Sequence, residues 1–321
     1  MTVLKNQPIK DHLYYKIGGT VKYLLKCDSP KEIEDALYFI HQNDIEKYLV
    51  IGLGSNVLMP DEMFEGAVLL LSSKDKPQME LVGEEKIKVY AGEEFDTLIN
   101  FAFDHGLVGL EWAGGLPSTV GGAVRGNAGA FGGETKDTVE SVQVLEITSN
   151  GITKKKLTNK DCHFSYRHSY IKDNPNLIVT NTVFKLKKAS DDEVSVARKV
   201  YKDHIKYRQT NHPMQYPSCG SVFKNIRDKE QVEKILTVWP DAKKIVETKW
   251  HGKFSMGYAI KRFDLVGKKV GGAQISEDHA NYIINMDNAK YSDVLSLINT
   301  IIKIFQDTFG FTPEPELQIV K

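Results

Sequence analysis

Three short stretches of the chain carry side chains that could do chemistry. Arg167 stands among aromatic residues, Ser221 directly follows a glycine, and Glu316 lies near the C-terminus. An arginine can bind a carboxylate through two parallel hydrogen bonds, and a hydroxyl or carboxyl group can give a proton to a reacting atom. On local sequence alone, a surface cation–π partner, a turn serine and a solvated tail are the commoner interpretations.

The glycine-rich stretch from Gly106 to Glu134 predicts a phosphate-holding loop. It holds ten of the 25 glycines, and apolar residues that flexible Gly/Ser linkers lack are interleaved with them. Glycine at this density weakens a helix or a strand, but it lets the backbone turn sharply and approach a ligand closely. Pro117 fixes a turn, and Ser118 and Thr119 add hydroxyl groups. We therefore expect this stretch to hold a pyrophosphate without a charged side chain.

A second candidate phosphate loop follows the predicted strand Tyr48–Ile51. This strand leads directly into Gly52–Asn56, with the sequence Gly-Leu-Gly-Ser-Asn. The full Gly-x-Gly-x-x-Gly spacing and the Walker lysine are both missing, so the sequence supports neither a Rossmann fold nor a P-loop. A glycine turn at the end of a strand is the commoner reason for such a pattern.

Composition indicates an ordinary globular protein. The 321 residues are 41% hydrophobic and 26% charged, with zero formal net charge, so no basic excess predicts nucleic-acid binding. No apolar run approaches a membrane span, and Met1–Lys10 lacks the apolar core of a signal peptide. Cys27, Cys162 and Cys219 are too scattered for a disulfide framework or a zinc site. We expect a cytoplasmic protein with no metal site, no membrane anchor and no nucleic-acid partner.

The elements that must position these residues are short strands and helices up to about residue 188. Ser29–Glu32 predicts a capped helix start, and Asn150-Gly151 predicts a hairpin turn. Further strands are predicted at 67–71, 86–91 and 178–186, and a helix at 95–102. The order favours an α+β fold over a regular βαβ array.

The composition changes near residue 189, where we expect a domain boundary. A long charged helix is predicted from Ser190 to about Arg208, and another helix at 255–263. A strand is predicted at 282–285. An apolar stripe from Val294 to Phe305 predicts a helix that ends at Gly310.

Seven segments resemble, in the same order, the UDP-N-acetylenolpyruvoylglucosamine reductase (MurB) family, flavoenzymes of bacterial cell-wall precursor synthesis. Each motif alone is moderately specific, but together they span nearly the whole chain. The shorter, second subtype is favoured because no extra insertion follows the arginine motif. The segments are Lys16–Gly19, Gly52–Asn56, Gly114–Glu134, Ser165–Ser169, Tyr216–Asn225, Val270–Asn285 and Glu314–Val320.

The resemblance implies an α+β fold with a two-subdomain FAD-binding unit of the PCMH type and a smaller α+β substrate-binding domain. The FAD-binding unit would cover residues 1–189, with subdomains of about 1–72 and 73–189, and a C-terminal strand at 312–321 would return to it. The substrate-binding domain would cover 190–311. Residues 228–253 are expected to be an inserted helical surface segment whose Trp239 and Trp250 pack against this domain.

The resemblance also implies the reaction and its catalytic residues. Hydride would pass from NADPH to FAD and on to the enolpyruvyl carbon of UDP-N-acetylglucosamine enolpyruvate, which gives UDP-N-acetylmuramate. Arg167 would hold the substrate carboxylate and its developing charge. Glu316 would hydrogen-bond the same group as a protonated acid. Ser221 would protonate the adjacent carbon.

Binding residues follow from the same resemblance. We expect FAD to be bound non-covalently, because no histidine lies between His41 and His105 to tether a flavin at the first loop. We also expect a monomer. UDP-sugar contacts are expected from Tyr166, Lys224, Asn225 and His279. Cofactor contacts are expected from Gly52, Gly54, Ser55, Asn56, Gly115, Pro117, Ser118, Thr119, Gly121, Gly122, Asn127, Gly129 and Ala130.

The sequence departs from the family pattern in three places. Phe131 stands where a tyrosine is common, Ile226 stands where a proline is common, and residues 228–253 are inserted. Two alternatives to the reductase are left open. One alternative is another PCMH-type FAD oxidoreductase that acts on a sugar or an alcohol. The other is a nucleotide-sugar sensor without turnover, but such a protein would be expected to lose at least one of Arg167, Ser221 and Glu316.

Overall fold

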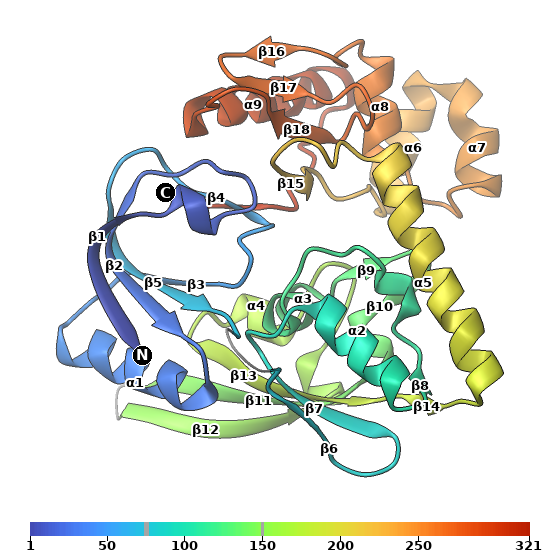
Figure 1. Ribbon diagram of the computed structural model, residues 1–321. Coiled ribbons are helices and arrows are strands. Elements are labelled where there is room, and N and C mark those ends of the chain that lie inside the picture. Colours follow the sequence, from blue (N-terminus) through green and yellow to red (C-terminus); the bar gives the residue numbers. More distant parts are fainter. Residues whose placement is uncertain (74–76, 149–150) are drawn as a thin grey trace. The chain divides into compact units, whose positions relative to one another are not determined.

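The computed structural model describes residues 1–73, 77–148 and 151–321, and it divides into two compact units (Figure 1). The first unit comprises Met1–Gln7, Thr20–Leu53 and Met63–Thr210. The second comprises Pro8–Gly19, Gly54–Glu62 and Asn211–Lys321. Each unit has its own continuous apolar core.

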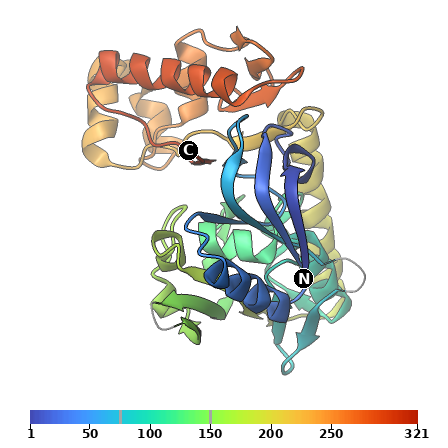
Figure 2. The same cartoon turned by 90° about the vertical axis from the view of Figure 1, so that its left-hand side faces the viewer.

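The first sheet of unit 1 has the strand order β1-β2-β5-β3. The strands are β1 (Thr2–Pro8), β2 (Thr20–Cys27), β5 (Phe64–Leu71) and β3 (Tyr48–Ile51), and β5 runs parallel to both β2 and β3. The blue strands β1, β2 and β5 lie side by side in Figure 2. Helix α1 (Pro30–Gln42) begins as predicted, because the Ser29 side chain accepts a hydrogen bond from the Glu32 N–H.

The second sheet of unit 1 has the order β12-β11-β13-β7-β6, with all neighbours antiparallel. Strands β11 and β12 form the predicted hairpin up to the pair Thr148–Gly151. Asn150 of the predicted turn lies outside the described residues. The strands are β6 (Met79–Leu81), β7 (Lys86–Tyr90), β11 (Val139–Thr148), β12 (Gly151–Thr158) and β13 (Leu177–Lys185).

Helices and short strands cover this sheet and continue the core. Helix α2 (Phe95–Asp104) buries Phe95, Leu98 and Ile99 in the core. The long helix α5 (Asp191–Asn211) comes after the last strand of the sheet in the sequence. The smaller elements are β8 (Leu107–Val108), α3 (Val120–Gly126), β9 (Gly129–Ala130), β10 (Gly133–Glu134), α4 (Tyr170–Asp173) and β14 (Lys187–Lys188).

Helix α3 lies within the stretch from Gly106 to Glu134, for which the sequence predicted a loop. Seven residues of this stretch are helical, because Thr119 caps the first turn and Val120, Ala123 and Val124 are buried in the core. A Cβ on Gly121 would lie 3.0 Å from the Ala91 Cβ. Glycine is therefore retained here for close packing, which offsets its low helix propensity.

Unit 2 is built around a small antiparallel sheet in the order β15-β18-β17-β16. Helix α9 (Tyr291–Phe309) packs on this sheet and ends, as predicted, at Gly310, whose φ is +73°. The C-terminal strand β19 (Gln318–Ile319) pairs in parallel with β4 (Val57–Leu58). The sheet strands are β15 (Ser218–Ser221), β16 (Lys269–Val270), β17 (Ala273–Ile275) and β18 (Tyr282–Asn285).

Residues 228–253 are helical, as predicted. They form α6 (Lys229–Val238) and α7 (Lys243–Thr248), and α8 (Met256–Arg262) follows them. The Trp239 ring lies 4.9 Å from the Phe309 ring and 5.0 Å from the Phe263 ring, centroid to centroid. Trp239 is thus part of the core of unit 2, and the segment is an integral layer of that unit.

The packing units do not follow the predicted domain borders. Helix α5 groups with unit 1, and the segments 8–19 and 54–62 group with unit 2 because they pack beside the C-terminal residues. The border near residue 189 and the return of residues 312–321 to the FAD-binding unit stay predictions about domains.

Candidate functional site

The backbone around Thr119 positions the predicted cofactor loop in unit 1. The Val120 N–H donates to the Glu93 carbonyl at 2.8 Å, and the Gly121 N–H donates to the Ala91 carbonyl at 2.8 Å. The Thr119 hydroxyl accepts from the Gly122 N–H at 3.4 Å. These bonds fix the start of α3 against the second sheet, and Ser118 remains half-exposed beside it.

The structure brings Gly52 and Thr119 together, although 67 positions separate them in sequence. A Cβ at Gly52 would lie 2.2 Å from the Thr119 Oγ1, so only glycine fits this approach. Within the described residues, the backbone N–H groups of Gly115 and Thr119 donate to no protein acceptor. Two predicted cofactor segments therefore meet at Gly52 and Thr119, and the second of them carries the two backbone donors.

Helix α5 holds the glycine-rich stretch from one side. The buried Arg208 donates from Nε to the Gly114 carbonyl at 2.9 Å. The exposed Phe131, at the turn between β9 and β10, stacks on the His204 ring with 4.0 Å between centroids. Figure 1 shows α5 beside β9 and β10. Tyr207 adds an edge contact to Phe131. Sequence reasoning missed these α5 contacts, since an amphipathic charged helix carries no signal for its partner.

Arg167 occupies a strained position in a tight turn. Two backbone hydrogen bonds between Ser165 and His168 close the turn, and Arg167 has a φ of +56°. A left-handed conformation costs a non-glycine residue about 1–2 kcal/mol, so the surrounding contacts must impose it. The guanidinium donates from Nη2 to the Gly129 carbonyl at 2.9 Å and lies over the Tyr166 ring. The arginine is thereby held against the glycine-rich stretch.

Asn127 is a predicted cofactor contact whose side chain is occupied by the protein. It is fully buried and caps α3 in the left-handed conformation. Its amide donates to the Ser165 carbonyl at 2.8 Å and to Glu134 at 3.1 Å, and its Oδ1 accepts from the Lys136 N–H at 3.0 Å. Direct cofactor contact by this side chain stays a prediction.

The other predicted cofactor residues lie in two places. Gly54, Ser55 and Asn56 belong to unit 2, where a Cβ on Gly54 would meet the Leu13 side chain at 2.6 Å and Asn56 donates to the Glu316 carbonyl at 3.2 Å. Gly129 and Ala130 form strand β9 in unit 1.

Ser221 ends strand β15 in unit 2. It pairs with Tyr282 of β18 across an irregular register, where Gly220 has a φ of +71°. Next to it, the Val222 N–H donates to the Asn281 carbonyl at 2.8 Å, and the buried Asn281 amide donates to the Phe223 carbonyl at 2.9 Å. The buried Asn281 thus fixes the backbone directly after Ser221. Sequence reasoning did not identify Asn281.

The C-terminal stretch lies on the other side of this segment. The Glu316 N–H donates to the Val222 carbonyl at 2.7 Å, and the Lys224 N–H donates to the Glu314 carbonyl at 3.0 Å. The Lys224 ammonium also pairs with the Glu314 carboxylate. Ser221 and Glu316, 95 positions apart, are therefore on neighbouring backbone segments of one unit. Arg167 belongs to unit 1.

A cluster of two histidines and a tyrosine adjoins the Ser221 strand. The Tyr282 hydroxyl is 2.9 Å from the His212 Nδ1, and the His279 ring lies 4.8 Å from the Tyr282 ring. Burial lowers the pKa of His279 below its usual value. The buried His279 Nδ1 has no hydrogen-bond partner within the part of the chain that the structure describes. Asn225, nearby in sequence to Ser221, accepts from the Met256 N–H at 3.1 Å.

Cys219, two residues before Ser221, is not a competing nucleophile. Burial raises the pKa of its thiol far above the usual range, and the thiol donates to the Val57 carbonyl at 3.1 Å. It stays protonated at neutral pH.

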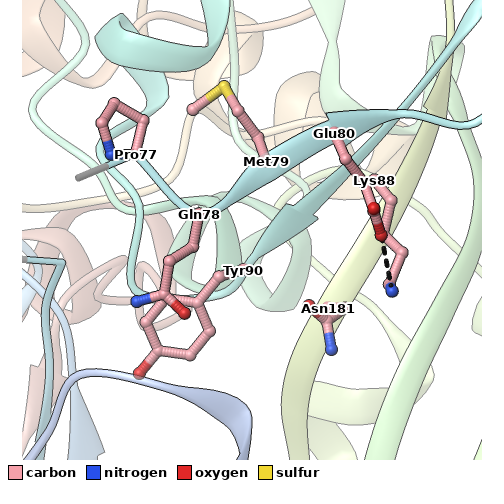
Figure 3. Close-up of a pocket in the computed structure, with 7 residues that line it drawn as sticks. All are labelled: Pro77, Gln78, Met79, Glu80, Lys88, Tyr90 and Asn181. Carbon is pink, nitrogen blue, oxygen red and sulfur yellow. Dashed lines mark hydrogen bonds and ion pairs between the residues drawn. The ribbon is translucent and has the colours of Figure 1, made fainter.

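One cavity of about 280 Å³ opens beside β6, β7 and β13 (Figure 3). Its polar side chains are largely satisfied: Lys88 pairs with Glu80 at 3.0 Å, and the Tyr90 hydroxyl donates to the Cys27 carbonyl at 2.8 Å. No predicted site residue lines it. Across residues 1–73, 77–148 and 151–321, no cluster of three potential metal-ligating side chains occurs, and no helix is long and apolar enough to cross a membrane.

Comparison with known families defines the class of protein first. Residues 21–154 match the FAD binding domain, so the chain is a flavin-binding protein with the predicted α+β fold. Residues 212–320 match the C-terminal domain of UDP-N-acetylenolpyruvoylglucosamine reductase.

Similarity to individual proteins extends over the whole chain. Curated UDP-N-acetylenolpyruvoylglucosamine reductases from Caldanaerobacter subterraneus and Caldicellulosiruptor bescii are 33% and 34% identical, over 98% and 99% of this chain and 92% and 90% of theirs. A crystal structure of the reductase from Thermus caldophilus matches 100% of this chain and 98% of its own, with a TM-score of 0.73 and 27% identity. The chain belongs to the UDP-N-acetylenolpyruvoylglucosamine reductase family, which confirms the resemblance found in the sequence.

Proposed function

We propose that this protein reduces UDP-N-acetylglucosamine enolpyruvate to UDP-N-acetylmuramate, with non-covalent FAD and with NADPH as the reductant. The observation that carries most weight is the Arg167 turn. An arginine held at positive φ stores conformational strain, which clusters at ligand-binding sites, and here the guanidinium is fixed on Gly129 of the glycine-rich stretch. The full-length similarity to named reductases supports the same activity.

The residues around Thr119 suit FAD. The backbone N–H groups of Gly115 and Thr119, which have no acceptor in the described part of the chain, and the half-exposed hydroxyl of Ser118 can hold a pyrophosphate without a cation. Because Gly52 has no side chain, its backbone could approach the ligand next to Thr119. Gly54–Asn56, Pro117, Gly121, Gly122, Gly129 and Ala130 complete the proposed set, whereas the three protein partners of the Asn127 side chain favour a positioning role for that residue. Bound FAD would supply the hydride chemistry between NADPH and the enolpyruvyl carbon.

Arg167 would bind the enolpyruvyl carboxylate. Hydride addition to the terminal carbon leaves negative charge on the adjacent carbon and its carboxylate. A guanidinium fork holds a carboxylate through two charge-assisted hydrogen bonds, and these bonds strengthen as the charge develops. The hydrogen bond to the Gly129 carbonyl fixes the plane of the guanidinium and so sets the direction from which a carboxylate can approach it.

Ser221 and Glu316 would act as the proton donor and the hydrogen-bond donor of the reaction. The Ser221 hydroxyl would give its proton to the carbon next to the carboxylate, and a carbanion-like partner is a strong enough base to take it. Glu316 would stay protonated and donate to the enolic oxygen. The backbone bond from Glu316 to Val222 keeps the carboxyl group on the segment that follows Ser221.

Four residues would contact the UDP-sugar. Lys224 can exchange its pairing with the exposed Glu314 for a phosphate. The Nδ1 of His279, which has no hydrogen-bond partner among the described residues, can bond the same substrate. Asn225 and Tyr166 complete the set. We also infer a monomer that works in the cytoplasm, in keeping with three buried, unpaired cysteines.

Anaerobic flavin spectroscopy of the purified holoenzyme tests the activity. NADPH should bleach the yellow flavin absorbance, and UDP-N-acetylglucosamine enolpyruvate should restore it without oxygen. UDP-N-acetylglucosamine, which lacks the enolpyruvyl group, is the matched control and should restore nothing. Recovery of the colour only on admission of air would contradict the proposed activity. Acid precipitation should release the colour, as expected for non-covalent FAD.

A further inference from the structure

The end of helix α3 is tied to the Arg167 turn by one side chain. We propose that Asn127 is a positioning residue that fixes the guanidinium of Arg167, an inference that rests on the role proposed above for Arg167. The Asn127 amide donates to the Ser165 carbonyl at 2.8 Å, and Ser165 is the residue that opens the turn. The bond lies entirely within unit 1.

This bond closes a ring that contains the guanidinium. From Asn127 the backbone runs through Ala128 to Gly129, whose carbonyl accepts from the Arg167 guanidinium at 2.9 Å. From Arg167 the backbone returns to Ser165, whose carbonyl accepts from Asn127. Two hydrogen bonds thus link the same two segments at both ends. With the Asn127 bond removed, the turn would lose its backbone link beside Gly129, and the arginine would be joined to Gly129 through its flexible side chain.

Asn127 is itself rigid enough to act as an anchor. It is fully buried, and its remaining amide partners, Glu134 and the Lys136 N–H, fix the orientation of the side chain. A buried amide with three protein partners has little freedom to rotate. Its left-handed backbone, with a φ of +41°, is one that asparagine tolerates and most residues do not.

The outer side of the turn is held independently. The Ser169 hydroxyl donates to the Arg125 carbonyl at 2.7 Å, and the Lys172 ammonium donates to the Arg167 carbonyl at 3.0 Å. These bonds would keep the turn attached to the fold when the Asn127 amide is removed. Loss of Asn127 should therefore change where the guanidinium lies without detaching the segment.

Asn127→Gly is the variant of choice, because glycine keeps the left-handed backbone and removes only the amide. In the holoenzyme, flavin reoxidation by the enolpyruvyl nucleotide should slow by about tenfold to a hundredfold, as for a misplaced binding group. Flavin reduction by NADPH and FAD content should stay at wild-type values. In the Arg167→Ala background, Asn127→Gly should cause no further loss, because the two residues act as one unit.

Asn159→Ala is the matched control. Asn159 also donates two hydrogen bonds to backbone carbonyls of unit 1, those of Lys136 and Val139 at 2.8 and 2.7 Å, but it does not touch the arginine turn. Its substitution should lower thermal stability and leave reoxidation unchanged.

Three outcomes would overturn the proposal. Normal reoxidation in Asn127→Gly would show that the tether does not position Arg167. Additive losses in the double variant would show that Asn127 acts on its own. Loss of FAD from Asn127→Gly would make it a cofactor support instead. If Arg167→Ala alone reoxidises normally, the proposed role of Arg167 fails, and this result is distinct from the other three.

Discussion

The glycine-rich stretch of unit 1 and the Ser221 segment of unit 2 are positioned by opposite means. In the first, the absence of side chains sets the geometry: Gly52 meets Thr119, and Gly121 meets Ala91, at distances that a Cβ would prevent. In the second, backbone pairing with distant residues sets it: Asn281 lies on one side of Val222, and Glu316 lies on the other. The first region offers backbone donors to a ligand, and the second offers side chains.

This difference assigns different sensitivities to the two regions. A Cβ added to the first region should disturb cofactor binding before chemistry, because the ligand is held by backbone shape. A functional group removed from the second should disturb chemistry before binding. The predictions below test this division, from the largest expected effect to the smallest.

Removal of the Ser221 hydroxyl should have the largest effect. If Ser221 is the carbon acid, it has no part in flavin reduction, and Ser221→Ala should be reduced by NADPH at near the wild-type rate. Reoxidation by the enolpyruvyl nucleotide should slow by about 10²-fold or more, or roughly 3 kcal/mol of barrier, as for a lost proton donor. Stopped-flow absorbance of the flavin measures both steps.

The Ser221→Cys variant is the matched comparison, because a thiol can still give a proton. It should recover part of the reoxidation rate. A serine that only supports the turn predicts another pattern, in which both half-reactions fall together or neither changes. Reduced FAD content in Ser221→Ala would contradict the assignment of cofactor binding to the first region and of chemistry to the second.

A methyl group at Gly52 should have the next largest effect. The Cβ of Gly52→Ala would lie 2.2 Å from the Thr119 Oγ1, so the two cofactor segments must move apart. We expect overpacking of about 1–3 kcal/mol and a loss of FAD affinity of about tenfold, measured by flavin fluorescence on dilution. At saturating FAD, both half-reactions should run near their wild-type rates.

Gly126→Ala is the control for the same chemical change. In the described parts of the chain, no heavy atom lies within 4 Å of a Cβ placed there, and the residue ends helix α3. Its FAD affinity should match the wild type. Equal losses in both variants would mean that glycine flexibility, and not close approach, governs cofactor binding.

The sequence predicts local elements well where the signal is local. The Ser29 cap, the strand Tyr48–Ile51 and the Gly310 helix end are all found at the predicted positions, because capping, short apolar runs and left-handed termini depend on neighbouring residues. The glycine-rich stretch was predicted as a loop and its helix α3 was not predicted, because the low helix propensity of glycine is outweighed there by tertiary packing on Ala91.

Contacts between distant segments could not be read from the sequence itself. No local pattern at Glu316 indicates that its backbone pairs beside Ser221, and the family resemblance alone suggested that they belong together. The anchors Asn127 and Asn281 were also beyond reach, because a buried asparagine that bonds a distant carbonyl looks in sequence like a turn residue. Strand β1 went unpredicted for lack of an apolar alternation.

The smallest expected effect is on the pH dependence of the melting temperature. It concerns the Ser221 region alone, because backbone groups do not titrate and side chains do. Burial lowers the pKa of His279 in the folded chain below its unfolded value of about 6.5. The unfolded chain therefore binds more protons as pH falls below that value, so the contribution of His279 to stability is complete above it and is lost on acidification. The melting temperature should fall more between pH 7.5 and 5.5 in the wild type than in His279→Gln, by about 1–3 °C.

The control is His41→Gln, which replaces an exposed histidine of unit 1. Its melting temperature should fall as that of the wild type does. The same fall in all three proteins would mean that the imidazole of the half-buried His279 is hydrated in solution, and the side-chain cluster beside Ser221 would then be open rather than packed.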